Sequence, residues 1–285
     1  MSAGAATLHV SFSGGEARGY AHIGTLQAIE QLGLRIGEVS GTSIGALVAA
    51  LVAVGYSAAE VAHVGLTLRR RDVFRYAWPE LRVLARFIRR GAARGPGLWT
   101  LAPYERTVDR LLGGARFRDL RVPCAIQATD LIQARPVWFR RDSHPEWPVA
   151  RAVAAAAALP GLMRPISWDG RLFADGGAYV RLDALRIRAD RIVVSDVSSH
   201  ADAPGPLDSV PRLLTAYLRA RERTTVPSRH VRGRPVALLR YPEILAGLGA
   251  FRRARPAVVR QVIADATASA FRLLEPLART GSLHA

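Results

Sequence analysis

The chain of 285 residues is 49% hydrophobic, which is enough to bury a sizeable core in one large domain or two small ones. Its single cysteine excludes an internal disulfide bond and is typical of a reducing compartment, so we expect a cytoplasmic protein. The formal net charge is +17, and arginine supplies all of the basic side chains because the chain contains no lysine.

A charge this positive attracts anionic lipid surfaces or nucleic acid. The arginines are scattered and no nucleic-acid-binding motif is present, so we do not expect a nucleic-acid partner. The start of the chain does not have the pattern of a signal peptide. The uncharged stretch 39–59 is interrupted by glycines and is better explained as a strand, a turn and a core helix than as a membrane span. We therefore expect peripheral contact with the inner membrane surface.

The first quarter of the chain alternates between strand and helix patterns. A β-rich segment at 8–12 breaks at a glycine pair, a helix pattern follows at 20–32, and a short strand at 36–40 precedes an apolar helix at 46–54. This order predicts a parallel sheet with right-handed crossovers, in which the loops after both strands lie at the same edge.

The rest of the chain continues this alternation, which favours an α/β fold in one domain. The predicted elements are a basic helical region at 61–112, strands at 122–129 and 136–139, a helix at 149–159, strands at 171–174 and 191–196, a helix at 207–223, a strand at 235–239 and a helix at 258–277.

A candidate nucleophile elbow follows the second strand and consists of Gly41, Thr42, Ser43, Ile44 and Gly45. In such an elbow a sharp strand-to-helix turn exposes the serine hydroxyl, and flanking glycines avoid the clash that a Cβ would cause. The serine could instead be an ordinary helix N-cap. We favour a nucleophile, which requires a general base and donors for an oxyanion.

A glycine pair follows the first strand, at the sheet edge where the serine is expected. Backbone N–H groups at the start of a helix point outward and carry partial positive charge, which suits an oxyanion. Arg18 could fix this loop or bind a phosphate, and an ordinary βα turn is the alternative interpretation. The candidate oxyanion hole comprises Gly14, Gly15, Glu16, Arg18 and Gly19.

The candidate general base is Asp175, which ends a predicted strand and precedes Gly176 and Gly177. Two glycines could free the carboxylate to reach the serine, although Asp-Gly is also a strong signal for a hairpin turn.

A histidine could complete a triad, and three follow Asp175 in the chain order of an α/β-hydrolase: His200, His230 and His284. The elbow, however, comes after only two strands, and none of these histidines lies in an obvious turn at a strand end. We therefore expect a Ser–Asp dyad, and we interpret His22 as a structural histidine near the oxyanion loop.

Several segments resemble motifs of the patatin-like phospholipase family: the glycine-rich oxyanion block at 11–24, the elbow at 41–45, the Asp-Gly-Gly motif at 175–177, and further segments at 128–131 and 155–165. The resemblance covers residues 7–197. It implies a lipid acyl hydrolase of the phospholipase A, lysophospholipase or esterase type with a Ser43–Asp175 dyad. It also implies a three-layer α/β/α sandwich around a mainly parallel sheet, a lipid or phospholipid substrate, and no metal or organic cofactor.

We accordingly expect a single domain over 1–285, with a motif-bearing core at 7–197, a basic helical cap or gate at about 61–112, and a C-terminal helical extension at about 198–285. Within the cap, the segment 69–99 interleaves arginines with aromatic and aliphatic residues, as in helices that lie on anionic lipid. Packing of this apolar face on the core is the alternative.

Some positions differ from the family pattern. Glu16 stands where a third glycine is usual, Ala156 where serine is frequent, and Arg181 and Asp183 lie near the usual asparagine and proline. A side chain at position 16 could weaken oxyanion binding. Two alternatives therefore stay open: a weak or inactive member that acts as a regulatory or binding protein, and an acyltransferase or thioesterase that uses the same serine.

Overall fold

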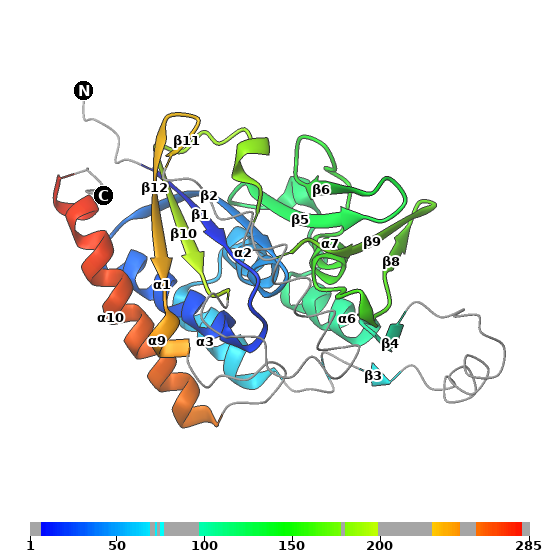
Figure 1. Ribbon diagram of the computed structural model, residues 1–285, viewed down its shortest axis with the longest axis horizontal. Coiled ribbons are helices and arrows are strands. Elements are labelled where there is room, and N and C mark those ends of the chain that lie inside the picture. Colours follow the sequence, from blue (N-terminus) through cyan, green and yellow to red (C-terminus); the bar gives the residue numbers. More distant parts are fainter. Residues whose placement is uncertain are drawn as a thin grey trace.

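The computed structural model describes residues 7–68, 72, 75–76, 97–177, 180–198, 230–245 and 255–280. Among these residues, one large sheet contains β1 (Thr7–Phe12), β2 (Arg35–Thr42), β5 (Cys124–Asp130), β6 (Arg135–Phe139), β8 (Ile166–Trp168), β9 (Arg171–Asp175), β10 (Arg191–Asp196), β11 (His230–Val231) and β12 (Arg234–Arg240). Figure 1 shows this twisted sheet at the centre of the protein.

The strand order is β11-β12-β10-β1-β2-β5-β9-β8, and β6 pairs with β5 outside this path. The five strands from β12 to β5 are mutually parallel, whereas β6, β8, β9 and β11 are antiparallel to their neighbours. The carboxyl ends of β1 and β2 therefore meet at one edge, as the alternating pattern of the first quarter predicts.

The described α-helices are α1 (Tyr20–Gln31), α2 (Ile44–Val54), α3 (Ala58–Thr67), α6 (Ala102–Leu111), α7 (Val149–Ala156), α9 (Pro242–Leu245) and α10 (Pro256–Thr280), and the short 3₁₀ turns are η1 (Glu16–Gly19), η2 (Phe117–Asp119) and η3 (Leu182–Ala184). Of these helices, none is both long and apolar enough to cross a membrane.

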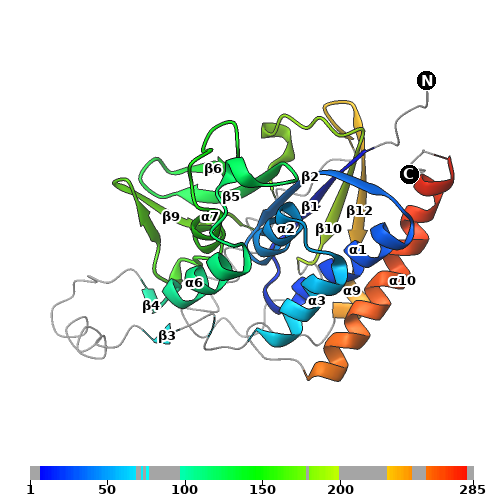
Figure 2. The same cartoon turned by 180° about the vertical axis from the view of Figure 1, so that it is seen from behind.

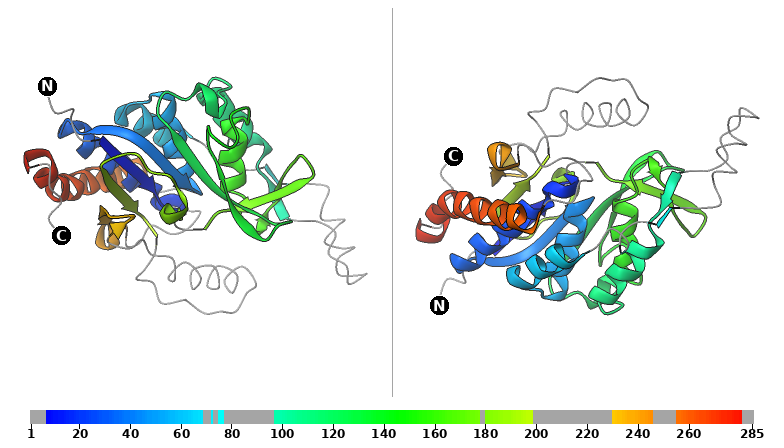
Figure 3. Two further views of the ribbon diagram at one scale, coloured as in Figure 1. Left: turned by 90° about the horizontal axis from the view of Figure 1, so that it is seen from above. Right: turned by 90° about the horizontal axis from the view of Figure 1, so that it is seen from below.

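Helices and a long connection cover opposite faces of the sheet. Leu8, Val10 and Phe12 alternate along β1 and are buried with side chains of α1, α2 and α7 in the main core. Figure 3 shows the blue and green helices against one side of the sheet. On the other face, the connection 180–190 packs against Ile192 of β10 in a second apolar cluster. The prediction of a mixed α/β fold with a mainly parallel sheet flanked by helices is confirmed.

The expectation of a helical region at 61–112 agrees with α3 and α6 but is wrong at two short strands. β3 (Arg75–Tyr76) and β4 (Gly97–Thr100) form a small sheet with β7 (Gly161–Met163). The Trp99 carbonyl accepts a hydrogen bond from the Arg164 N–H at 2.9 Å, which ties β4 to the chain after β7. Most of the arginine-rich segment 69–99 (residues 69–71, 73–74 and 77–96) and the predicted helix at 207–223 lie outside the described residues.

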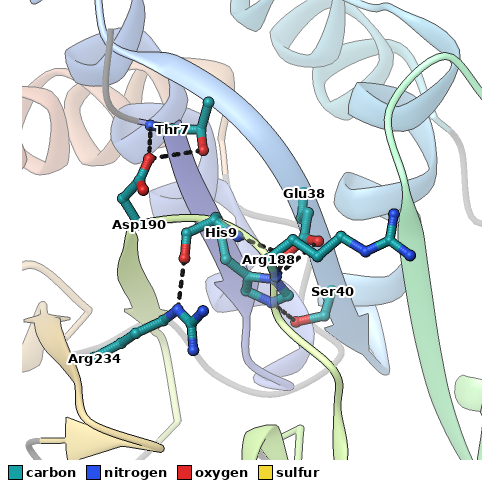
Figure 4. A network of polar contacts seen from close by, with 8 residues as sticks. Thr7, His9, Glu38, Ser40, Arg188, Asp190 and Arg234 are labelled. Atoms are coloured by element: carbon teal, nitrogen blue, oxygen red, sulfur yellow. Dashed lines mark hydrogen bonds and ion pairs between the residues drawn. The ribbon is translucent and has the colours of Figure 1, made fainter. Parts of the chain in front are cut away.

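A polar network ties the connection 180–190 to β1 and β2 (Figure 4). The Glu38 carboxylate accepts hydrogen bonds from the backbone N–H groups of Arg188 at 3.0 Å and Ala189 at 3.4 Å. It also contacts the His9 ring at 3.3 Å, and the other ring nitrogen lies 2.8 Å from Ser40 Oγ. Burial raises the pKa of Glu38, but these hydrogen bonds outweigh it and leave the pKa below its usual value.

The C-terminal helix α10 lies along α1 at very short range (Figure 2). A Cβ placed on Gly24 of α1 would lie 2.6 Å from Ala266 Cβ and 2.7 Å from the Thr267 nitrogen of α10. The Thr267 hydroxyl lies 2.8 Å from Gln27 Oε1 across the same contact. Because β12 is part of the sheet and α10 packs on α1, the C-terminal segment shares the core of the first 200 residues.

We predict that Gly24→Ala destabilises the protein, because the added methyl would force α1 and α10 apart. Overpacking of this kind lowers the free energy of unfolding by about 1–3 kcal/mol, whereas the higher helix propensity of alanine raises it by only about 1 kcal/mol. Gly65→Ala in α3 is the matched control, since its nearest neighbour is a flexible atom, Ile23 Cδ1 at 3.3 Å. Urea denaturation measures both variants. Equal stability of Gly24→Ala and wild type would contradict the prediction.

Candidate active site

Ser43 lies at the turn between β2 and α2, in a conformation that few serines adopt. Its backbone has φ 51° and ψ −127°, a conformation that costs about 1–3 kcal/mol and persists only where the surrounding structure holds it in place. A Cβ on Gly45 would lie 2.2 Å from the Phe12 carbonyl oxygen, and a Cβ on Gly41 would lie 2.2 Å from the Gly45 carbonyl oxygen. The structure therefore explains both glycines of the predicted elbow by close backbone contact.

The glycine loop after β1 lies beside this elbow. Phe12, at the end of β1, is paired with Gly41 near the end of β2. η1 follows the loop, and a Cβ on Gly19 would lie 2.5 Å from the Ile44 side chain. The first turn of α2 and the start of α1 are thus in contact.

Arg18 closes the glycine loop on itself. Its backbone N–H and its Nε–H both donate to the Gly15 carbonyl oxygen, at 3.1 Å and 3.2 Å. Of the two roles expected for Arg18, the structure supports fixing the loop. In the part of the chain that the structure describes, the N–H groups of Gly14 and Gly15 donate to no protein acceptor. Two backbone donors are therefore present next to the elbow.

Asp175 lies at the end of β9, two strands from β2. It is paired with Ala128 of β5, and the preceding residue of β5, Gln127, is paired with Thr42. Because neighbouring strands lie about 4.8 Å apart, the backbones of Asp175 and Thr42 are about 10 Å apart. The Gly177 N–H donates to Asp175 Oδ1 at 2.7 Å, which holds one oxygen of the carboxylate against its own turn.

The turn after Asp175 folds back toward the elbow. Thr42 Oγ1 lies 3.2 Å from the Gly177 carbonyl oxygen and 3.3 Å from that of Gln127. A Cβ on Gly176 would lie 2.6 Å from Thr42 Oγ1, which explains the glycine at this position. The structure thus brings the Asp-Gly-Gly turn into direct contact with the residue that precedes Ser43.

Gln127 and Thr129 of β5 hold this turn. Thr129 lies in the motif-like segment 128–131, to which the sequence assigned no role, and Gln127 precedes that segment. The buried Gln127 side chain donates to the Gly176 carbonyl oxygen at 2.8 Å and accepts from the Arg181 N–H at 2.7 Å. Thr129 Oγ1 donates to the Asp175 carbonyl oxygen at 2.9 Å. The one available signal is a glutamine within an apolar strand, because a buried amide must find hydrogen-bond partners.

The positions that differ from the family pattern have separate surroundings. Ala156 is fully buried at the end of α7. The Arg181 and Asp183 side chains form an exposed ion pair at 3.3 Å. Glu16 begins η1, and its side chain lies outside the described part.

Two histidines within the sheet core are hydrogen-bonded through both ring nitrogens. His22 contacts Ser195 Oγ at 2.8 Å and donates to the Ser13 carbonyl oxygen at 2.9 Å, which confirms its structural interpretation. His9 bridges Glu38 and Ser40 in the order of a triad, but Ser40 is 0% exposed and cannot meet a substrate. His200, His284 and the side chain of His230 lie outside the described residues.

Cys124 is buried, and burial raises the pKa of its thiol to about 12, so the thiol is neutral and unreactive near pH 7. Within the described ranges, no group of three or more His, Cys, Asp or Glu side chains is arranged to hold a metal ion.

The neutral state of His22 makes stability depend on pH. Burial lowers the pKa of His22 from 6.5 to about 4, so the unfolded chain takes up a proton before the folded protein does. The stabilisation is complete above pH 6.5 and is lost as the pH falls toward 4. A difference of one in pKa between the folded and unfolded states corresponds to about 1.4 kcal/mol. The neutral His22 therefore contributes roughly 3 kcal/mol to the free energy of unfolding above pH 6.5.

We therefore predict that His22→Gln, which cannot take up a proton, loses less stability than wild type between pH 6.5 and pH 4. Urea denaturation at several pH values in this range measures how the free energy of unfolding of each protein changes with pH. His63→Gln, at an exposed position of α3, is the control and should follow wild type. Parallel curves for His22→Gln and wild type would contradict the prediction.

Comparisons with known proteins agree with this arrangement of motifs. Residues 10–185 match the family model described as patatin-like phospholipase. The chain is 31% identical over 220 residues to an uncharacterized NTE family protein of Mycobacterium tuberculosis, an alignment that covers 76% of this chain and 56% of that protein. It is 28% identical over 198 residues to the lysophospholipase NTE1 of Candida glabrata, covering 66% of this chain and 10% of that protein.

Among solved structures, VipD from Legionella pneumophila has a similar fold, with a TM-score of 0.55 at 14% identity over 95% of this chain and 66% of that chain. The chain spans little more than half the length of its mycobacterial relatives. Because the family model matches well over half of its residues, the protein belongs to the patatin-like phospholipase family.

Proposed function

We propose that this protein is a serine hydrolase of lipid carboxylic esters, of the phospholipase A, lysophospholipase or esterase type. One observation carries the proposal: a strained serine elbow, an Asp-Gly-Gly turn and a glycine loop lie at one sheet edge, and two N–H groups of that loop donate to no acceptor among the described residues. The family membership and the similarity to a lysophospholipase support the same class of substrate.

In the first step, Ser43 Oγ attacks the ester carbonyl while the Asp175 carboxylate takes up the hydroxyl proton. The Gly177 N–H binds Oδ1 of this carboxylate and so reduces its freedom to rotate, which favours proton transfer. The N-terminus of α2 begins directly after Ser43, and its partial positive charge stabilises the negative charge that develops there.

The carbonyl oxygen becomes an oxyanion in the tetrahedral intermediate. The N–H groups of the glycine loop supply its hydrogen bonds, and the loss of one such donor typically costs about 3 kcal/mol of transition-state stabilisation. Collapse of the intermediate returns the proton to the leaving alcohol or lysolipid and leaves an acyl ester on Ser43. Asp175 then accepts a proton from a water molecule whose oxygen attacks the acyl carbon, and it passes this proton to Ser43 Oγ as the bond to the acyl group breaks and the fatty acid leaves.

We predict that Ser43→Ala and Asp175→Asn each lower the hydrolysis of a short-chain p-nitrophenyl ester by roughly 100-fold or more, since each removes a group that acts on the reacting atoms. Ser43→Ala should also abolish labelling by a fluorophosphonate probe. Peptide mapping of the labelled protein identifies the modified residue.

Ser167→Ala and Asp169→Asn are matched controls at exposed positions of the β8–β9 hairpin and should keep wild-type activity. Asparagine also tolerates the positive φ of 48° at position 169. Full activity in Ser43→Ala, or a probe adduct on another residue, would refute the proposed nucleophile.

The substrate class suggests that the protein works at an anionic lipid surface, which the net charge of +17 would attract. We predict that it floats with vesicles of phosphatidylcholine and phosphatidylglycerol at low salt but not with phosphatidylcholine vesicles alone. Added salt should release it, because screening weakens the attraction between exposed charges. Equal flotation with both vesicle types at every salt concentration would contradict this prediction.

A further inference from the structure

Behind the glycine loop, buried polar side chains form a continuous hydrogen-bonded chain, composed of Tyr241, Thr25, Ser195 and His22. Each of the four is at most 2% exposed. The hydrogen-bonded chain starts at the phenol directly after β12 and ends at the carbonyl oxygen of Ser13, the residue that precedes Gly14. It therefore connects the C-terminal segment to the candidate oxyanion hole.

The contacts have one consistent assignment of hydrogens. The Ser13 carbonyl oxygen can only accept, so His22 Nε2 carries the hydrogen of the 2.9 Å contact. Burial keeps the ring neutral, so Nδ1 accepts from Ser195 Oγ at 2.8 Å. Ser195 then accepts from Thr25 Oγ1 at 2.8 Å, and Thr25 accepts from the Tyr241 phenol at 2.6 Å. Each of these four hydrogen bonds therefore uses one hydrogen, and each donor lies on the Tyr241 side and each acceptor on the side of the glycine loop.

Ser13 transmits this orientation to the amides of the loop. Its N–H donates to the Ser195 carbonyl oxygen at 3.0 Å, and its hydroxyl accepts from the Val197 N–H at 2.8 Å and lies 3.1 Å from the Gly14 carbonyl oxygen. A trans peptide directs its C=O and the next N–H to opposite sides. The bond from His22 to the Ser13 C=O therefore aims the Gly14 N–H, and the bond to the Gly14 C=O aims the Gly15 N–H.

A merely space-filling role would be served better by apolar side chains. Burial of a hydroxyl or an imidazole is costly unless each polar atom is paired, and a fully paired network fixes a single arrangement of its members. The His22 ring is also held by an edge-to-face contact with Phe12, with ring centroids 5.3 Å apart. The strand end, the histidine and the loop are thus fixed together.

We propose that Tyr241, Thr25, Ser195 and His22 are positioning residues that hold the N–H groups of Gly14 and Gly15 in the orientation that binds the oxyanion. The inference rests on the proposed hydrolase function and extends the site beyond the family match, which ends at residue 185. Ser195 and Tyr241 both follow the end of that match, and Tyr241 lies in the last quarter of the chain, in which no sequence motif is recognisable.

Tyr241→Phe is the most direct test, because it removes one hydroxyl and leaves the ring. We expect kcat for a short-chain p-nitrophenyl ester to fall roughly 10-fold, with KM within about twofold of wild type, since small misplacements of catalytic groups reduce rates steeply. The second-order rate of fluorophosphonate labelling at Ser43 should fall in parallel.

Tyr56→Phe is the matched control. The Tyr56 hydroxyl donates to the Leu111 carbonyl oxygen at 2.9 Å, beyond the far end of α2 and about 16 Å along the helix from Ser43. This variant loses the same kind of hydrogen bond, so any loss of stability can be compared, but kcat and KM should stay at the wild-type values.

A pair of variants at position 22 supplies a rescue test. His22→Gln keeps an N–H donor that can reach the Ser13 carbonyl oxygen, whereas His22→Leu has none, so we expect Gln to retain several-fold more kcat than Leu. Wild-type kcat in Tyr241→Phe, or equal kcat for the two substitutions at position 22, would overturn the positioning role while leaving the hydrolase intact. A wild-type protein that neither hydrolyses the ester nor reacts with the probe would overturn the proposed function, and the positioning role with it.

Discussion

The candidate site depends on the contact between the end of β1 and the first turn of α2. Gly45 lies so close to the Phe12 carbonyl oxygen that only a hydrogen fits between them, and Gly41 lies equally close to the carbonyl oxygen of Gly45. This contact forces Ser43 into its positive-φ conformation and places the glycine loop beside it. No flexible side chain lies in either contact, so the backbone itself sets the distance between the serine and the loop amides.

Such backbone contacts are also why part of the site could be predicted from the sequence. A Gly-x-Ser-x-Gly turn or an Asp-Gly-Gly turn requires particular residues at fixed spacing, and the sequence displays them directly. Gln127 and Tyr241 could not be found in this way, because their roles follow from the strand order. Gln127 meets the Asp-Gly-Gly turn because β5 lies between β2 and β9, and Tyr241 reaches α1 because β12 pairs with β10.

The fold shows the same division between local and long-range information. The helix α10 has enough turns for its apolar pattern to be recognised, and the strand β12 is bounded by turn residues, so both were predictable. The strands β3, β4 and β7 have two to four residues each, too few to show a period of two. β4 also pairs with β7, which lies about 60 residues further along the chain. The basic composition around β3 and β4 favoured helices instead.

In a Ser–His–Asp triad, the third residue orients the base, and a dyad must obtain that orientation elsewhere. Here the Gly177 N–H binds the Asp175 carboxylate, and Gln127 binds the backbone on both sides of the turn. The connection 180–190, which follows this turn, is held in the same way: the Glu38 carboxylate binds the backbone N–H groups of Arg188 and Ala189 (Figure 4). Gly177 has a positive φ of 92°, a backbone conformation that other residues rarely adopt. The hydrogen bonds from Gln127 and to Asp175 restrict the backbone freedom that the two glycines would otherwise have. In the proposed dyad, the backbone thus provides for the aspartate the orientation that a triad obtains from a side chain.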